Sequence, residues 1–399
     1  MGVGKKYSGY KAFQYLEPGK DYRAFKLSKA TDRVEPYWVE LSKEQEQQVR
    51  DIAAKYPVIS LHEHPVLWVD NMEEIFEYNR EGRHFAAYEA LSDSCLDAVF
   101  DNFMDGVCTI TSKGGWKWTD VLHDMGVRLC DLAQQDFLIR CERVEDIQRA
   151  HDEGKIALVP SLESATMIEN ELDRVEILYG FGVRIMGLVY SEANVLGSGL
   201  KEKRDGGLTH FGHQVVERMN KIGMAIDVSH CGEQTAMDTV LASKKPIFIT
   251  HTGARALWDA KRLKTDEVIK ACADRGGLIG IEAAPHTTIT KKNDVHSVES
   301  FMEHFEYIKD LVGIDHVSFG PDTLYGDHVG LHHAFAAHLS IKQAFTMHKE
   351  VPYVKGMENP TEASWNIIRW LVKHEYSEAD IAKVIGGNTI RVLKEVWVG

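Results

Sequence analysis

Two histidines separated by one residue are the first sign of chemistry in this chain. His62 and His64 directly follow the apolar run Val58-Ile59-Ser60-Leu61. Side chains at positions i and i+2 of a strand lie on one face, and neutral imidazole is a common ligand for zinc and related ions. The pair therefore predicts two metal ligands at the end of a strand, although one such spacing among 19 histidines could arise by chance.

More polar residues stand where later apolar runs end. These are Glu163, Tyr190, His230, His251 and Asp322. One histidine on an apolar element is more often a core residue than a ligand. Four histidines, a glutamate and an aspartate in equivalent positions are hard to attribute to chance, and together they predict a metal site.

The chemistry of a two-metal site fits these side chains. We expect His62 and His64 to hold one divalent ion and His230 with His251 to hold the other. Glu163 would bridge both ions and leave room for a bridging hydroxide. Imidazoles with one shared carboxylate favour zinc over magnesium or calcium, and manganese, iron and cobalt remain alternatives.

Hydrolysis is the reaction that such a centre would catalyse. Bound divalent metals lower the pKa of water towards about 7 and polarise a scissile carbonyl. Asp322 is suited to take the proton of the water and return it to the leaving amine.

The elements that must position these residues are short apolar runs that alternate with helical patterns. The runs cover residues 57–61, 106–110, 156–161, 183–189, 225–229, 246–250, 278–281 and 316–319. Eight such units predict an α/β fold of the (β/α)₈ TIM-barrel type, whose sites lie at the carboxyl ends of the strands. A doubly wound open sheet is the alternative, but no glycine fingerprint opens a first βα turn. A helical pattern over 41–56 precedes the first strand. We therefore expect an extension over residues 1–40 and a single barrel domain over 41–399.

Bulk composition excludes several classes of protein. The chain is 44% hydrophobic and 27% charged, with a net charge of −14 and scattered basic residues, so we expect neither nucleic acid nor an anionic membrane as a partner. No apolar run reaches the about 18 residues that span a bilayer, and the start lacks an apolar signal core, which favours a cytoplasmic location. The six cysteines form no Cys-x-x-Cys pair and are interpreted as buried thiols.

Several ordered motifs resemble the membrane (renal) dipeptidase family of amidohydrolase-like metal barrels, in its bacterial branch. The likeness runs from about residue 58 to residue 397. It is carried by Asp227-Val228-Ser229-His230, Thr250-His251-Thr252-Gly253-Ala254-Arg255-Ala256-Leu257, Gly386-Gly387-Asn388-Thr389-Ile390-Arg391-Val392 and Gly207-Leu208-Thr209-His210-Phe211-Gly212.

The resemblance implies a role for individual residues. It implies that Glu163 is the bridging ligand, that His230 and His251 hold the second metal, and that Asp322 is the acid/base. It also implies that Arg262 binds the free carboxylate of the substrate, which its planar fork suits; a solvated charge at a helix start is the alternative.

Two positions depart from the family pattern. His64 stands where the family usually has an aspartate, which keeps a ligand and replaces an anion by a neutral group. Tyr190 stands where the animal enzymes have a substrate-binding histidine, and Tyr190 with Asn194 resembles the bacterial relatives, which implies that both residues bind the substrate. The tyrosine hydroxyl could donate to a developing oxyanion, or the residue could be a core tyrosine with a wet tip.

The sequence thus predicts a binuclear-metal hydrolase that cleaves an amide bond of a small, dipeptide-like substrate bearing a carboxylate. A specialised non-peptide amidohydrolase, a lactonase or a decarboxylase on the same barrel is the alternative, and a non-catalytic scaffold is the rival from another class. The partner would be a small molecule, and a homo-oligomer remains open.

Overall fold

The central element is a ring of parallel strands. The computed structural model describes residues 4–103, 117–285, 287–338 and 351–398. Within these residues eight parallel positions follow one another around the sheet. Their strands are β1 (Ile59–Leu67), β3 (Ala98–Asn102), β5 (Ile156–Leu162), β6 (Ile185–Gly187), β7 (Ala225–Asp227), β8 (Phe248–Thr252), β9 (Leu278–Ile281) and β10 (Val317–Phe319). The predicted α/β barrel is confirmed.

The barrel closes through a split eighth strand. β10 pairs with β9, and the next strand, β11 (Leu324–Tyr325), pairs in parallel with β1. Between them the backbone nitrogen of Asp322 donates to the carbonyl of His62 at 3.1 Å, and the nitrogen of His64 donates to the carbonyl of Thr323 at 2.9 Å. The crossover from one neighbour to the other therefore places Asp322 beside the histidines of β1.

Two short strands extend this sheet at its sides. β2 (Phe85–Ala86) pairs antiparallel with β1, and β4 (Leu138–Arg140) pairs in parallel with β5. The predicted strand 106–110 lies outside the described residues. The second position of the barrel is filled by β3, whose run Ala98-Val99-Phe100 is followed by the polar pair Asp101-Asn102.

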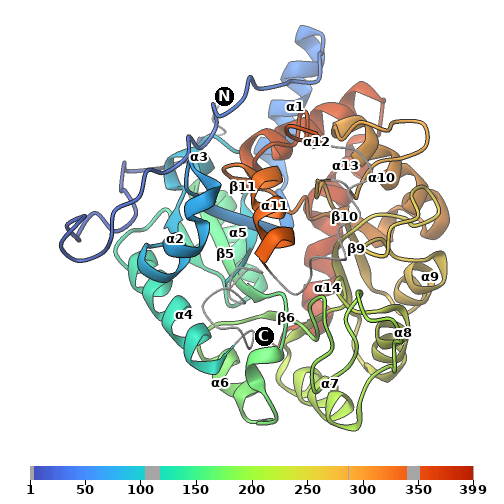
Figure 1. Cartoon of the computed structure of the whole chain (residues 1–399). Coiled ribbons are helices and arrows are strands. Elements are labelled where there is room, and N and C mark those ends of the chain that lie inside the picture. Colours follow the sequence, from blue (N-terminus) through green and yellow to red (C-terminus); the bar gives the residue numbers. More distant parts are fainter. Residues whose placement is uncertain (1–3, 104–116, 286, 339–350, 399) are drawn as a thin grey trace.

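Helices surround the strands (Figure 1). The longer ones are α1 (Lys43–Lys55), α4 (Trp118–Leu132), α5 (Val144–Glu153), α7 (His210–Ile222), α8 (Glu233–Ala242), α9 (Asp266–Asp274), α10 (Val298–Val312), α11 (His328–His338), α12 (Pro360–Lys373) and α14 (Asn388–Val396). The shorter ones are α2 (Ile75–Glu81), α3 (Tyr88–Ser92), α6 (Arg174–Gly180), α13 (Glu378–Ala382) and the single turns Met72–Glu74, Thr166–Ile168, Ile314–His316 and Lys383–Gly387. α1 confirms the helix predicted over 41–56, and it begins at Ser42, whose side chain forms a capping box with Gln45. No helix of the described residues is both long and apolar enough to cross a membrane.

The interior of the barrel is filled by alternate residues of the strands. Ile59 and Leu61 of β1 and Ala98 and Phe100 of β3 belong to one buried cluster. The same cluster contains Val392, Leu393 and Val396 of α14, together with Trp397. Because side chains alternate along a strand, this face packs inward while the intervening residues pack against the surrounding helices. The core therefore fills the barrel below the ends of the strands that carry the polar residues.

The segment before α1 follows the outside of the barrel (Figure 1). Asp131 of α4 accepts hydrogen bonds from the Tyr10 hydroxyl at 2.7 Å and from the backbone nitrogen of Phe13 at 2.6 Å. Asn366 and Arg369 of α12 bind the backbone of residues 37–39. The division into an extension and one barrel domain stays a prediction.

Candidate metal centre

Three candidate metal ligands meet at the carboxyl end of the barrel. His62 Nε2 of β1 lies 3.1 Å from Oε1 of Glu163, which directly follows β5. The ring of His62 stacks on that of His251 in β8, with ring centroids 3.5 Å apart. All three side chains are buried. Burial alone would lower the pKa of His62, but the carboxylates of Asp322 and Glu163 raise it to about 10. The two buried carboxylates therefore favour a positive charge at this place.

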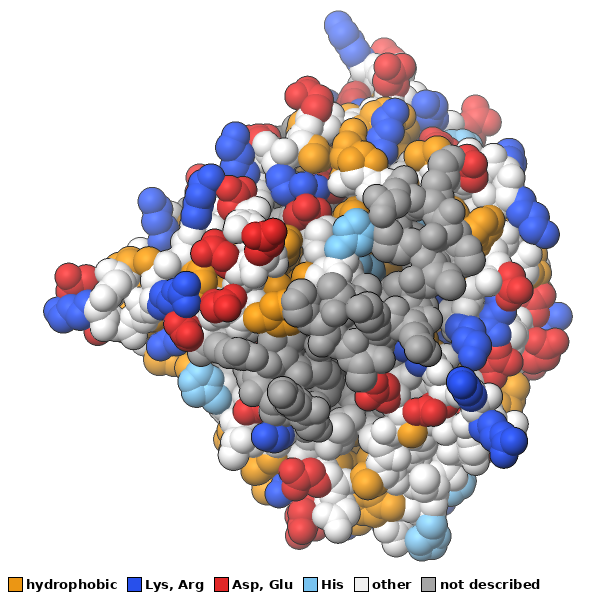
Figure 2. Space-filling view, viewed as in Figure 1, with side chains coloured by type: hydrophobic (Ala, Val, Ile, Leu, Met, Phe, Trp, Pro, Cys, Tyr) orange, Lys and Arg blue, Asp and Glu red, His pale blue; other side chains and the backbone are white. Residues whose placement is uncertain are grey.

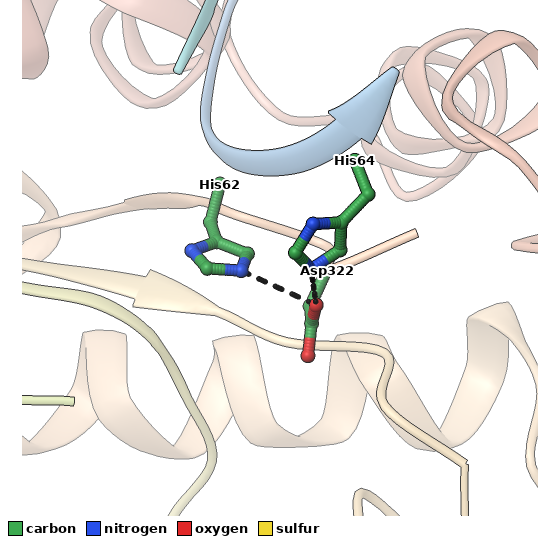
Figure 3. Close-up of side chains that lie close together, drawn as sticks. All are labelled: His62, His64 and Asp322. Atoms are coloured by element: carbon green, nitrogen blue, oxygen red, sulfur yellow. Dashed lines mark hydrogen bonds and ion pairs between the residues drawn. The ribbon is translucent and has the colours of Figure 1, made fainter. Parts of the chain in front are cut away.

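Asp322 joins the two histidines of β1. Its Oδ1 lies 3.3 Å from Nε2 of His62 and 3.2 Å from Nε2 of His64, and Figure 3 shows both rings directed at the same oxygen. Burial opposes ionisation of this carboxyl, yet His62 and His64 together hold its pKa well below the usual range. Asp322 is therefore an ionised carboxylate in a buried place.

His230 completes the cluster from the segment after β7. Its Nε2 lies 3.1 Å from Nε2 of His251 and 3.9 Å from Oε1 of Glu163. The ring of Tyr190 stacks on that of His230 at a centroid distance of 4.2 Å. Burial, with the charge of Arg262 and of His62 nearby, lowers the pKa of both His230 and His251 well below 6.5. Both imidazoles are thus neutral, which is the form that binds a metal.

The nitrogen and oxygen atoms of this cluster are spaced as the ligands of a bound cation would be. They form three overlapping sets, each with its ligand atoms within 4.8 Å of one another: His62, His64 and Asp322; His62, Glu163 and His251; His251, Glu282 and Asp322. Oε2 of Glu163 is buried without a hydrogen-bond partner among the described residues. A buried carboxylate oxygen without a donor is costly, and a bound cation would satisfy it.

Neighbouring side chains orient the ligands. The Thr250 hydroxyl donates to Asp227 at 2.8 Å, so its oxygen accepts from Nδ1 of His251 at 2.7 Å and leaves the Nε2 lone pair directed at the centre. The Asn102 amide lies 2.7 Å from Nδ1 of His62 and fixes that ring. Neither Asn102 nor Thr250 was predicted from the sequence. The available signal was position, because Asn102 is the last residue of β3 and Thr250 directly precedes His251 in β8.

Arg262 borders the centre from the loop between β8 and α9. Its Nη1 donates to the carbonyl of His251 at 3.2 Å, and its Nη2 lies 2.6 Å from Oε2 of Glu282. Glu282 directly follows β9 and is 0% exposed. The guanidinium is therefore not a solvated charge at a helix start, and its partner is an acidic residue that the sequence did not pair with it.

The side chain of Asn194 makes local hydrogen bonds in this structure. Its amide nitrogen donates to the Thr166 hydroxyl at 3.1 Å and to the carbonyl of Leu188 at 2.8 Å. Its oxygen accepts from the nitrogen of Leu196 at 2.8 Å. Asn194 thus joins the segment that follows Tyr190 to the turn after β5, and its contact with a substrate stays a prediction.

The fold and this cluster define a (β/α)₈ barrel of the metal-dependent hydrolase class. The family model for membrane dipeptidase (peptidase family M19) matches residues 46–397. The chain belongs to this family, and it is a metal-dependent hydrolase of the dipeptidase type.

Individual relatives agree with the family match. The dipeptidase tcpJ of Claviceps purpurea is 26% identical over 318 residues, which are 79% of this chain and 67% of that protein. A crystal structure of an amidohydrolase from Pseudomonas aeruginosa is 26% identical with a TM-score of 0.72, and the match covers 88% of this chain and 99% of that one. A metallopeptidase from Rhodobacter sphaeroides, solved with a phosphinate mimic of the dipeptide L-Ala-D-Ala, shares the fold at 19% identity and a TM-score of 0.66, over 86% of this chain and 99% of that one.

Proposed function

We propose that the chain hydrolyses the amide bond of a small dipeptide-like substrate at a centre of two divalent ions, with zinc as the favoured metal. The observation that carries the proposal is the convergence of four histidines and two carboxylates on one end of the barrel, within 4.0 Å of a partner in each case. The dipeptidase name of the Claviceps relative supports the peptide bond as the target.

The ligands divide between the two ions by position. His62 and His64 would hold one ion, and His230 with His251 would hold the other. Glu163 suits the bridging place because its Oε1 lies 3.1 Å from His62 and 3.9 Å from His230, while its Oε2 is still unpaired. When bound, the ions would acidify water and polarise the scissile carbonyl.

Proton transfer would fall to Asp322. Its carboxylate is ionised and faces the histidines, so it can accept the proton of the attacking water. The same Oδ atoms would then return the proton to the leaving nitrogen, so that the amine departs neutral. Tyr190, held flat against His230, would donate its hydroxyl to the oxyanion that develops on the carbonyl oxygen.

Arg262 would receive the carboxylate of the substrate. Nη1 donates to the carbonyl of His251 and Nη2 faces Glu282, so an incoming carboxylate would have to share the guanidinium with this acidic neighbour. The small-molecule partner, the cytoplasmic location and a homo-oligomer stay predictions from the sequence.

A substrate panel with metal analysis tests the proposal. We expect turnover of L,L or L,D dipeptides by protein that holds two zinc ions per chain. Turnover of lactones or N-acyl amides without any dipeptide would favour the specialised non-peptide alternative. Fewer than one ion per chain after purification in excess zinc would contradict the binuclear centre itself.

A further inference from the structure

Arg262 meets a buried acidic partner at the place where the proposed function needs a free positive charge. The guanidinium lies 2.6 Å from the carboxylate of Glu282, and the two side chains are 11% and 0% exposed. A close ion pair in a site shielded from water is weakly screened. A substrate carboxylate bound by the same guanidinium would lie only one side chain away from Glu282 and would be repelled by it.

The guanidinium cannot easily turn away from this partner. The loop that carries it is tied back on itself, because Arg255 donates to the carbonyls of Ala260 and Leu263 at 3.2 and 3.0 Å. Lys264 in the same loop donates its Nζ to the carbonyl of Cys231 at 2.5 Å. Arg262 itself is anchored on the carbonyl of His251. The loop therefore holds Arg262 against the end of β9.

Glu282 is equally fixed. Its second oxygen, Oε1, accepts from the hydroxyl of Thr287 at 3.1 Å, while Oε2 faces Arg262. The hydrogen bond to Oε1 and the charge of the guanidinium beside Oε2 favour the pair over a move towards the candidate metal ligands. This carboxylate nevertheless lies beside the candidate metal centre, because a Glu282 oxygen is within 4.8 Å of ligand atoms of His251 and Asp322.

We infer that Glu282 is a specificity-determining positioning residue that, through its ion pair with Arg262, removes the preference for a free substrate carboxylate and makes C-terminal amides of dipeptides substrates as well. The inference rests on the proposed function and deepens it by naming a neutral-ended substrate class. Its physical basis is competition between two anions, because the Glu282 carboxylate already lies at the Arg262 guanidinium that would bind the carboxylate of the substrate.

Steady-state kinetics on a matched substrate pair test this inference. The probes are a dipeptide that the substrate panel identifies as a substrate and the C-terminal amide of the same dipeptide. Both are measured on zinc-loaded wild type and on Glu282→Gln. In wild type we expect kcat/KM for the two substrates to agree within about tenfold. In Glu282→Gln the KM for the free dipeptide should fall by about tenfold, while the KM for the amide stays unchanged.

Two further variants make the result specific. In an Arg262→Gln background, Glu282→Gln should change neither KM, because Glu282 acts through Arg262. Glu358→Gln is the matched control, since it removes the buried partner of Arg33 in the contact between the N-terminal segment and the turn before α12. It should leave the ratio of the two substrates at the wild-type value.

Metal content separates positioning from ligation. Zinc per chain should be the same in Glu282→Gln and wild type; loss of one ion would make Glu282 a ligand and overturn the inference. Normal turnover with an unchanged substrate ratio, or a wild-type preference for the free dipeptide of more than about a hundredfold, would overturn it alone. If the wild type cleaved no dipeptide of the substrate panel, the proposed function would be overturned together with the inference.

Discussion

At the scale of single residues, Asp322 combines a chemical role with an unusual backbone. Its φ is +58°, in the left-handed region that most residues avoid. Asparagine and aspartate tolerate this region better than other residues with a Cβ. An asparagine at this position therefore removes the charge without adding backbone strain, whereas an alanine would change both.

We expect Asp322→Asn to lower kcat by about 10²- to 10⁴-fold, because the amide cannot accept and return a proton. The measurement is kcat with a dipeptide at saturating zinc, together with the unfolding temperature. An unfolding temperature close to that of wild type would show that the loss is chemical. Full activity of this variant would remove Asp322 from the acid/base role.

Thr250 gives a second prediction at this scale. Thr250→Val should weaken zinc binding by about tenfold or more, because His251 loses the acceptor that keeps its proton on Nδ1. Competition with a chelator measures this affinity. Thr252→Val is the control, since the Thr252 hydroxyl donates to the carbonyl of Gly253 at 3.2 Å and not to His251; equal losses in both variants would contradict the orienting role.

At the scale of elements, α10 supports the loop that presents Arg262. Nδ1 of His304 accepts from the backbone nitrogen of Ala254 at 2.9 Å, and its Nε2 donates to the carbonyl of Ile289 at 3.1 Å. These partners require a neutral ring. Burial is the main cause that lowers the pKa of His304 to about 4, so this contact between helix and loop should be sensitive to acid.

The pH dependence of stability follows from that pKa. Between pH 6.5 and pH 4 the unfolded chain binds a proton that the folded His304 does not, so the free energy of unfolding should fall as pH falls. The full effect is about 3 kcal/mol, and it should be absent above pH 6.5. Urea unfolding of wild type and His304→Gln from pH 4 to 8 measures the difference. The exposed His374, replaced by Gln, should leave the pH profile as in wild type.

At the scale of the whole molecule, the segment before α1 joins parts of the barrel wall that are distant in sequence. Asp131 on α4 takes hydrogen bonds from Tyr10, Phe13 and Tyr88, and α12 binds residues 37–39. Around the rim on the face of Figure 2, acidic and basic side chains are interspersed over the described surface. Polar contacts with this segment thus accompany the hydrophobic core in holding the wall.

Tyr10→Phe should lower the free energy of unfolding by about 1–3 kcal/mol, because the buried Asp131 loses a donor. Tyr15→Phe is the matched control: Tyr15 is exposed, and its hydroxyl lies 3.7 Å from the sulfur of Cys130, a weak acceptor. Chemical unfolding measures both variants. Equal free energies of unfolding of the two variants would show that the hydrogen bond from Tyr10 to Asp131 does not stabilise the fold.

Much of the site could be predicted because its ligands stand next to the strands that carry them. The apolar runs before His62, Glu163, His230 and His251 can be recognised in the sequence as strands. Parallel strands bring their carboxyl ends to one edge of the sheet. The second strand was harder to recognise, because β3 offers only three apolar residues before Asp101 and Asn102. Asn194 was carried over from a resemblance, and its local hydrogen bonds could not be foreseen.

By itself, the sequence determined the barrel, the family and the end of the barrel at which the polar residues lie, since these depend on periodicity and on order along the chain. Only the tertiary structure decided that Glu282 pairs with Arg262, that Thr250 and Asn102 orient the ligands, and that the split strand β10–β11 brings Asp322 to β1. The reason is physical: each of these depends on side-chain direction and on distances of a few ångströms between separate strands and loops, which a linear pattern does not contain.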